Sequence, residues 1–284
     1  MKASVKYKVI HRFKDKYNVQ DMCFFFGVSR SGYYAWTKKI NNEDPDKAVG
    51  ELIQQCQCKT RQTYGYRRVR IWLLREFGLM MNHKAVLRVM NKYNLLSKSR
   101  RRRKWTQNCE SVHKYANLLE RNFHAERPNL KWCTDISYIP TKEGFVYLSV
   151  IKDLYDNFVV AYKVGNTNDN NLVYETLKAA KREVTAELQL HSDQGFQYTS
   201  QAYFNLTQSY GITPSMSRRG NPYDNAMVEN FFSILKTECI YRTKLKTYED
   251  ARILISEYIH FYNNERIQLK TKLTPLEKRS QYVA

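Results

Sequence analysis

Long apolar segments are absent from this sequence of 284 residues. No stretch reaches the roughly 18 consecutive apolar residues that a membrane-spanning helix needs, and the opening residues, MKASVKYKVIHRFKDK, contain no continuous apolar stretch that could act as a signal peptide. These absences argue against a membrane protein and a secreted one. We therefore expect a cytosolic protein, with enough hydrophobic residues, 43% of the sequence, to form packed cores.

Paired cysteines are absent as well. The six cysteines lack the paired spacings of a disulfide framework or a zinc site; they are Cys23, Cys56, Cys58, Cys109, Cys133 and Cys239. Cys56 and Cys58 could be combined with His113 and His124, but the order and the C-x-C spacing are wrong for a zinc-binding module. The sequence therefore predicts buried, reduced thiols.

Acidic residues are few, and the imbalance lies at one end of the chain. The sequence has 47 Lys and Arg against 27 Asp and Glu, a net charge of +20. Residues 1–104 hold 25 basic and 7 acidic residues, so 25 − 7 = +18, whereas residues 105–284 hold 22 and 20, so 22 − 20 = +2. A surface charged in this way attracts a polyanion. The interleaved tyrosines and arginines favour nucleic acid over the alternative that the charge only keeps the protein in solution.

Residues 1–46 read as a first helical unit. An opening helix to about Tyr17 is followed by helical segments at 19–28 and 29–39, with Gly27 at the turn and Ser29 as a cap. This arrangement is typical of a helix-turn-helix, whose last helix would present Arg30 to a DNA groove.

Residues 47–96 read as a second unit of three helices. Gly78 ends the middle helix and Asn82 caps the last, and Arg67 and Arg68 are candidate DNA contacts. For both units, a plain helical bundle that positions other parts of the protein is the alternative.

Residues 97–124 are expected to form a basic linker. It contains five consecutive basic residues, Arg100, Arg101, Arg102, Arg103 and Lys104. Because these charges repel one another, we expect an extended segment that lies along DNA phosphates. A solvated surface stretch would have the same sequence.

Residues 125–284 change to a strand pattern. Three strand-like segments at 130–140, 145–155 and 158–164 are followed by alternating helical and strand segments, then an amphipathic helix at 248–265 and an extended tail. This order predicts an α/β fold, a ribonuclease H-like mixed sheet with flanking helices.

Three acidic residues in this region suit a metal site. Asp135 lies within a strand, where Asp is unusual, and Asp193 follows a strand at the end where α/β sheets bind ligands. At 100° per residue, Glu229 shares one edge of its helix with Asn225 and Lys236. Carboxylates bind divalent cations, and two such ions about 4 Å apart can hold the attacking and leaving oxygens of a phosphodiester. Taken singly, each acid has an ordinary alternative as an exposed strand residue, a turn cap or a polar helix face.

Together these segments resemble the DDE catalytic core of retroviral integrases and bacterial transposases, and most closely the OrfB-type transposases of insertion-sequence family three. The matching stretches are PNLKWCTDISYI, HSDQGFQYTS and GNPYDNAMVENFFSILKTE, with 35 residues between Asp193 and Glu229. GVSRSGYYAW, YGYRRV and YNNERIQLKTKLTP also resemble that family. The resemblance thus extends over nearly the whole chain.

The resemblance implies a metal-dependent transposase that cuts DNA at the ends of its mobile element and joins the 3′-hydroxyl to another phosphodiester. Two Mg²⁺ ions, replaceable by Mn²⁺, would be held by Asp135, Asp193 and Glu229, while Asn225 and Lys236 would contact the DNA backbone. The implied partners are double-stranded DNA of the element ends and the target, further copies of the chain in a synaptic complex, and an upstream-frame helix-turn-helix protein. Two alternatives stay open: a ribonuclease H-type nuclease and a non-catalytic DNA-binding regulator derived from a transposase.

Overall fold

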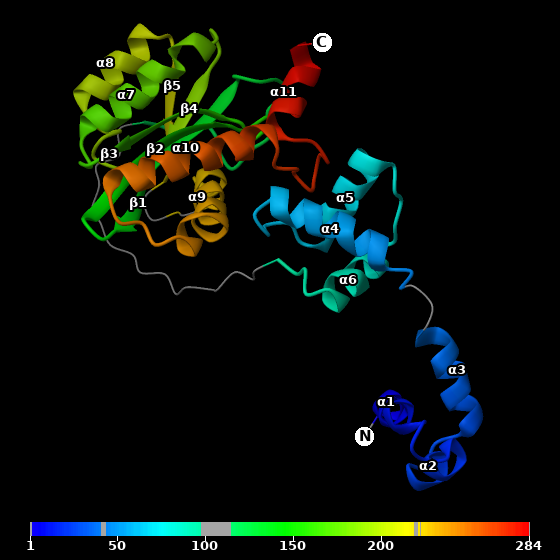
Figure 1. Ribbon diagram of the computed structural model, residues 1–284. Helices are drawn as coiled ribbons and strands as arrows, with labels where there is room; N and C mark the ends of the chain where they lie inside the picture. The colour runs from blue at the N-terminus through cyan, green and yellow to red at the C-terminus, as the bar shows by residue number, and fades with distance from the viewer. Residues whose placement is uncertain (1, 41–43, 98–114, 219–220, 222, 284) are drawn as a thin grey trace.

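The computed structural model describes residues 2–40, 44–97, 115–218, 221 and 223–283, which form three units in chain order (Figure 1). The basic run from Arg100 to Lys104 lies outside the described residues, as do Cys109 and His113. None of the described helices combines the length and the apolar character needed to cross a membrane.

The first unit consists of α1 (Ala3–Phe13), α2 (Val19–Phe25) and α3 (Arg30–Ile40), and Figure 1 shows it set apart from the other two units. Its small core contains Ile10, Cys23 and Tyr33. The predicted local signals are confirmed, because Gly27 has a φ of +59° and the Ser29 hydroxyl accepts a hydrogen bond from the Gly32 N–H at 3.1 Å.

The second unit consists of α4 (Lys47–Lys59), α5 (Tyr66–Phe77) and α6 (His83–Lys92). The predicted helix ends are confirmed here too, since Gly78 has a φ of +64° and Asn82 accepts from the Lys84 N–H at 2.9 Å. The buried residues of this unit include one from much later in the chain; they are Ile53, Cys56, Tyr64, Val69, Trp72, Leu73, Val86, Val89, Met90 and Ile267.

A five-stranded sheet forms the centre of the third unit. Its strands are β1 (Lys131–Thr141), β2 (Gly144–Asp153), β3 (Val159–Gly165), β4 (Gln189–Ser192) and β5 (Thr213–Met216). The order is β3-β2-β1-β4-β5; the first three strands are antiparallel hairpin neighbours, and β4 and β5 run parallel to β1. The predicted ribonuclease H-like mixed sheet is confirmed.

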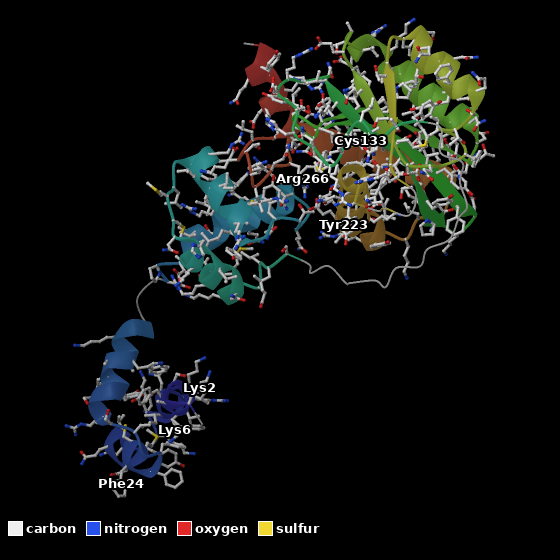
Figure 2. The ribbon with its side chains drawn as sticks, turned by 180° about the vertical axis from the view of Figure 1, so that it is seen from behind. Lys2, Lys6, Phe24, Cys133, Tyr223 and Arg266 are labelled. Atoms are coloured by element: carbon white, nitrogen blue, oxygen red, sulfur yellow. The ribbon has the colours of Figure 1, made fainter. Side chains whose placement is uncertain are left out.

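Helices cover both faces of this sheet (Figure 1). Because side chains alternate along β1, Cys133 packs against α9 (Ala226–Glu238) and α10 (Tyr248–Asn264), whereas Trp132 packs on the side of α7 (Asn170–Ala180) and α8 (Gln201–Ser209). Figure 2 shows Cys133 within the core. The same alternation directs Asp135 to the face that α9 covers.

The predicted extended tail is wrong, because residues Pro275–Val283 form a helix, α11. The Glu277 N–H donates to the Thr274 hydroxyl at 3.1 Å, and the Thr274 N–H donates to the Glu277 carboxylate at 2.9 Å. This reciprocal capping box, with Pro275 in the first turn, starts the helix. Arg279 then anchors α11 to the sheet through Asp153 at 2.6 Å and Asp156 at 2.8 Å.

The second unit is docked on the third through the segment between α10 and α11. The Tyr64 hydroxyl accepts from the Ile267 N–H at 2.8 Å and donates to the Glu265 carbonyl at 3.0 Å. Arg68 donates to the Ile267 carbonyl at 3.0 Å. Figure 2 shows Arg266 at this boundary. The guanidinium of Arg68, a predicted DNA contact, thus serves an internal contact.

Four described cysteines are buried and unpaired, as predicted: Cys23, Cys56, Cys133 and Cys239. Cys58 is exposed, which corrects the prediction for that residue. Two positions beyond Cys56, it lies about 200° around α4, away from the buried stripe.

Candidate active site beside strands β1 and β4

The parallel pairing of β1 and β4 brings two of the predicted acids together. Cys133 stands opposite His191 in this pairing. Two residues farther along, Asp135 lies within β1 and Asp193 directly follows the end of β4, so the pairing of these strands brings the two acids close together. Two acids separated by more than fifty positions in the sequence thus become neighbours.

Each of these two carboxylates has one oxygen held by the backbone. The Ile136 N–H donates to Asp135 Oδ1 at 2.7 Å, and the Gly195 N–H donates to Asp193 Oδ1 at 2.9 Å. A Cβ atom at position 195 would lie 3.0 Å from Asp193 Oδ1, so glycine allows the backbone this close approach. These bonds orient the carboxylates.

Glu229 comes from the first turn of α9. The buried residues Val228, Phe231, Phe232 and Leu235 pack the helix against the sheet. Two further contacts fix its start: Lys152 of β2 donates to the Met227 carbonyl at 3.0 Å, and the Asn225 side chain donates to the Thr134 carbonyl at 3.3 Å. The second contact reaches the residue next to Asp135.

Asp193 and Glu229 lie close enough to Asp135 for their charges to act on its carboxylate. Burial raises the pKa of Asp135 well above its ordinary value, and the negative charges of Asp193 and Glu229 raise it further, while Lys236 acts in the opposite direction. The pKa of Glu229 is raised by burial and by Asp193, and burial raises the pKa of Asp193. Cations would relieve this repulsion.

The donor chemistry of the site fits magnesium or manganese, which prefer carboxylate oxygens. Among the described residues, no three His, Cys, Asp or Glu side chains already stand as a ready ligand group.

His191 has a structural role beneath the acids. Its Nδ1 lies 2.9 Å from the Ser215 hydroxyl and its Nε2 lies 3.0 Å from the Ser217 hydroxyl. Because Ser217 donates to the Ser192 carbonyl at 3.2 Å, it accepts from His191, which places the proton on Nε2. Burial lowers the pKa of His191 to about 4, so the imidazole is neutral and joins β4 to the loop after β5.

The predicted DNA contacts lie in different surroundings. Arg30 is exposed and donates to the Gln20 side chain at 3.0 Å, and Arg67 is exposed over the ring of Tyr66. Lys236 lies near enough to influence the pKa of Asp135. Asn225, however, is only 4% exposed. Its side chain, predicted to contact the DNA backbone, forms a buried link between the start of α9 and β1.

Sequence reasoning missed Asp224, which the structure places at the entrance to α9 with Arg121 and Arg218 on its carboxylate. It also missed Tyr198, buried behind the site with its hydroxyl 3.3 Å from that of Thr134. No local spacing links residue 121 to residue 224. Only the fold brings them together.

Domain-family models agree with this architecture. Two integrase core domain models match residues 125–222 and 229–283, and an HTH-like domain model matches residues 43–103. Among solved structures, the catalytic core domain of BIV integrase overlaps 55% of this chain and 96% of its own, at 22% identity and a TM-score of 0.43.

Relatives at higher identity span nearly the whole chain. The putative transposase InsK for insertion sequence element IS150 of Escherichia coli is 36% identical over 96% of this chain and 98% of its own length. Transposase InsF for insertion sequence IS3A, from the same organism, is 31% identical over 92% of this chain and 93% of its own. The chain therefore belongs to the IS3 family of insertion-sequence transposases.

Proposed function

We propose that this protein cleaves DNA at the ends of an insertion sequence and transfers the freed 3′-hydroxyl to a second phosphodiester. The observation that carries the proposal is the grouping of Asp135 on β1, Asp193 directly after β4 and Glu229 in the first turn of α9 beside the paired strands β1 and β4. Membership of the transposase family supports the same reaction.

In this proposal Asp135, Asp193 and Glu229 hold two Mg²⁺ ions, or Mn²⁺ in their place. Bound there, the ions would lower the pKa of the attacking oxygen and stabilise the leaving oxygen. The raised pKa values of the three acids mean that cation binding competes with protons. Lys236 would hold a phosphate of the bound DNA as a point charge.

The grouping of the acids also bears on the alternatives. A non-catalytic regulator has no need for three carboxylates gathered at one place. A ribonuclease H-type nuclease would use these acids, but the docked helical unit and the transposase relatives favour strand transfer. The proposed partners are DNA of the element ends and target, further copies of the chain in a synaptic complex, and an upstream-frame helix-turn-helix protein.

The experiment uses purified protein, Mg²⁺ and labelled duplexes that carry the element ends, read from the DNA on both sides of the gene. We expect wild-type protein to yield both cleaved and joined products. Asp135→Asn, Asp193→Asn and Glu229→Gln should abolish both while leaving DNA binding intact, because each weakens a metal ligand with little change in volume. Glu249→Gln, an exposed acid on α10, is the matched control and should remain active.

Every outcome that differs from this expectation points to a specific alternative. Nicks without joined products would favour a nuclease, and sequence-specific binding without either product would favour a regulator. If one of the three acid variants kept near-normal joining activity, the acid replaced in that variant would not belong to the catalytic site.

A further inference from the structure

Asp224 collects an unusual number of hydrogen bonds. Its carboxylate is 0% exposed and accepts from the backbone N–H, Nε and Nη2 of Arg218 at 3.0, 3.1 and 3.2 Å. It also accepts from Nε of Arg121 at 3.3 Å and from the Asn117 side chain at 2.9 Å. One buried acid thus holds two arginines.

The two arginines face outward. Their side chains are 51% exposed for Arg121 and 56% exposed for Arg218, in contrast to the buried carboxylate between them. Among the described contacts, Asp224 accepts a hydrogen bond only from Nε of Arg121, so the two terminal nitrogens of Arg121 can bind other groups. The cluster therefore keeps a net positive charge at the surface, held in a fixed geometry.

This cluster lies next to the acid site. Arg218 directly follows Ser217, whose hydroxyl and backbone N–H both bond to the Ser192 carbonyl, at 3.2 and 2.9 Å, immediately before Asp193. Asp224 begins the entry to α9, five positions before Glu229, and it influences the pKa of His191. The arginines are thus tied to the segments that carry the second and third acids.

Tyr223 adds an aromatic ring to the cluster. Its ring is 68% exposed, and the Arg121 guanidinium lies over it, 5.7 Å from the centroid. Figure 2 shows Tyr223 at the start of α9, on the outside of the core. An exposed tyrosine beside cations is suited to a sugar or a base of a nucleic-acid strand.

The backbone that delivers Arg121 is in an unfavourable conformation. Glu120 and Arg121 have consecutive positive φ values of 45° and 62°, in the left-handed region that non-glycine residues rarely adopt. The buried side chain of Leu119 and the hydrogen bond from the Glu120 N–H to Asn117 Oδ1 at 3.0 Å hold this turn. Such strain is characteristic of functional positions.

We propose that Arg121 and Arg218, held by Asp224, bind adjacent phosphates of one DNA strand beside the acid site, with Tyr223 against the neighbouring nucleotide. The identity of the ligand as DNA rests on the proposed function. Guanidinium groups match phosphate oxygens with paired donors. Asp224 keeps the two cations in place before the DNA arrives, which reduces the cost of ordering them.

The first test measures DNA binding in EDTA, so that no chemistry takes place. Fluorescence anisotropy of a labelled duplex gives the slope of log K against log salt for wild type, Arg121→Ala, Arg218→Ala and the double variant. Each lost phosphate contact should reduce the slope by about 0.9, and the double variant by about 1.8. Arg252→Ala is the matched control, because Arg252 is 54% exposed and also paired with an acid, on α10. It should leave the slope unchanged.

The second test asks whether Asp224 affects DNA binding by positioning the two arginines or only by its negative charge. Glu120 is exposed and acts electrostatically on Arg218. On charge alone, both Asp224→Asn and Glu120→Gln should strengthen DNA binding. We expect Asp224→Asn to weaken it instead, and Glu120→Gln to maintain or strengthen it. Thermal unfolding of Asp224→Asn checks its fold, and if that variant does not fold, the arginine variants decide.

An unchanged slope in the double arginine variant, or tighter binding by a folded Asp224→Asn protein, would overturn the inference. The double arginine variant could keep the wild-type slope but lose binding of an acidic peptide. That result would assign the arginines to a protein partner and would also overturn the inference. Failure of the proposed function is distinguishable, since it would appear as missing joined products in Mg²⁺ and would leave the EDTA slopes untouched.

Discussion

Arg266 holds Glu238 through two parallel hydrogen bonds, from Nε to Oε2 at 2.8 Å and from Nη2 to Oε1 at 2.7 Å. Nη1 of Arg68, in the second helical unit, lies 3.7 Å from the same Oε1. Glu238 is the last residue of α9, the helix that carries Glu229. One carboxylate therefore joins the helix of the third acid to a unit far away in the sequence.

Replacing Glu238 with Gln should weaken this junction strongly. The change would leave the buried guanidinium of Arg266 without its counter-charge, which typically costs about 3–5 kcal/mol. Urea unfolding at neutral pH measures the loss. Glu249→Gln, which breaks an exposed pair with Arg252, is the control and should change stability little. An equal effect of the two variants would contradict a structural role for the junction.

Arg67 and Arg68 are sequence neighbours with opposite expected roles. Arg67 is exposed, whereas the Arg68 side chain is 18% exposed and bonded to the Ile267 carbonyl. Arg67→Ala should reduce the salt slope of DNA binding by about 0.9 and leave unfolding unchanged. Arg68→Ala should lower stability and leave the slope unchanged. Anisotropy titrations and urea unfolding of both variants give the answer, and exchanged phenotypes would refute the assignment.

Arg279→Ala should release α11 from the sheet. Asp153 and Asp156 are both 0% exposed and share this arginine, so its removal leaves two buried acids unpaired. At pH 7.5 we expect a loss of about 3–5 kcal/mol in the free energy of unfolding. Faster proteolysis near the C-terminus should accompany it. Arg252→Ala provides the exposed control, and resistance of the Arg279→Ala tail to protease would contradict the anchoring role.

The loss caused by Arg279→Ala should depend on pH. Burial, followed by the charge of Asp156, raises the pKa of Asp153 from 3.8 to about 6. A raised pKa means that this group's contribution to stability is full below 3.8 and is lost as pH rises through 6. Removing Arg279 raises the pKa further, so the variant should be most defective above pH 7 and less so at pH 5. Equal defects at both pH values would refute this.

Lys236→Ala should weaken binding of element-end DNA and reduce joining, because the lysine lies on the edge of α9 that faces the acids. Lys236→Arg should restore much of the binding and less of the rate, since the guanidinium keeps the charge but alters its geometry. Crosslinking from position 236 to element-end DNA tests the contact directly. Full activity of the Ala variant would place Lys236 on an ordinary solvated helix face.

Periodic and local signals predicted most of the fold. The strand that contains Asp135, the helix edge shared by Glu229 and Lys236 and the caps at Ser29 and Asn82 depend on residues within one or two turns of each other. The helix α11 differs from the predicted extended tail although its signal is local, because Thr274 and Glu277 cap each other three positions apart and so start a helix.

Other features depend on contacts between residues that lie far apart in the sequence and could not be predicted from local patterns. An exposed arginine and a largely buried one look alike in sequence, so the sequence predicts a DNA contact for both Arg67 and Arg68. Asn225 lies on the same helix edge as Glu229, but the backbone of β1 occupies the space in front of it. The grouping of Arg121 and Arg218 on Asp224 exists only after the loop beyond β5 has packed.

Ile267 has a consequence for protein synthesis. It fills the core of α4–α6 together with Tyr64 and Val69, although more than 170 residues separate it from the end of α6. A growing chain on the ribosome would therefore display an incomplete second unit until Ile267 emerges. Fragments released before that point would lack a complete core in this unit as well as the helix α11.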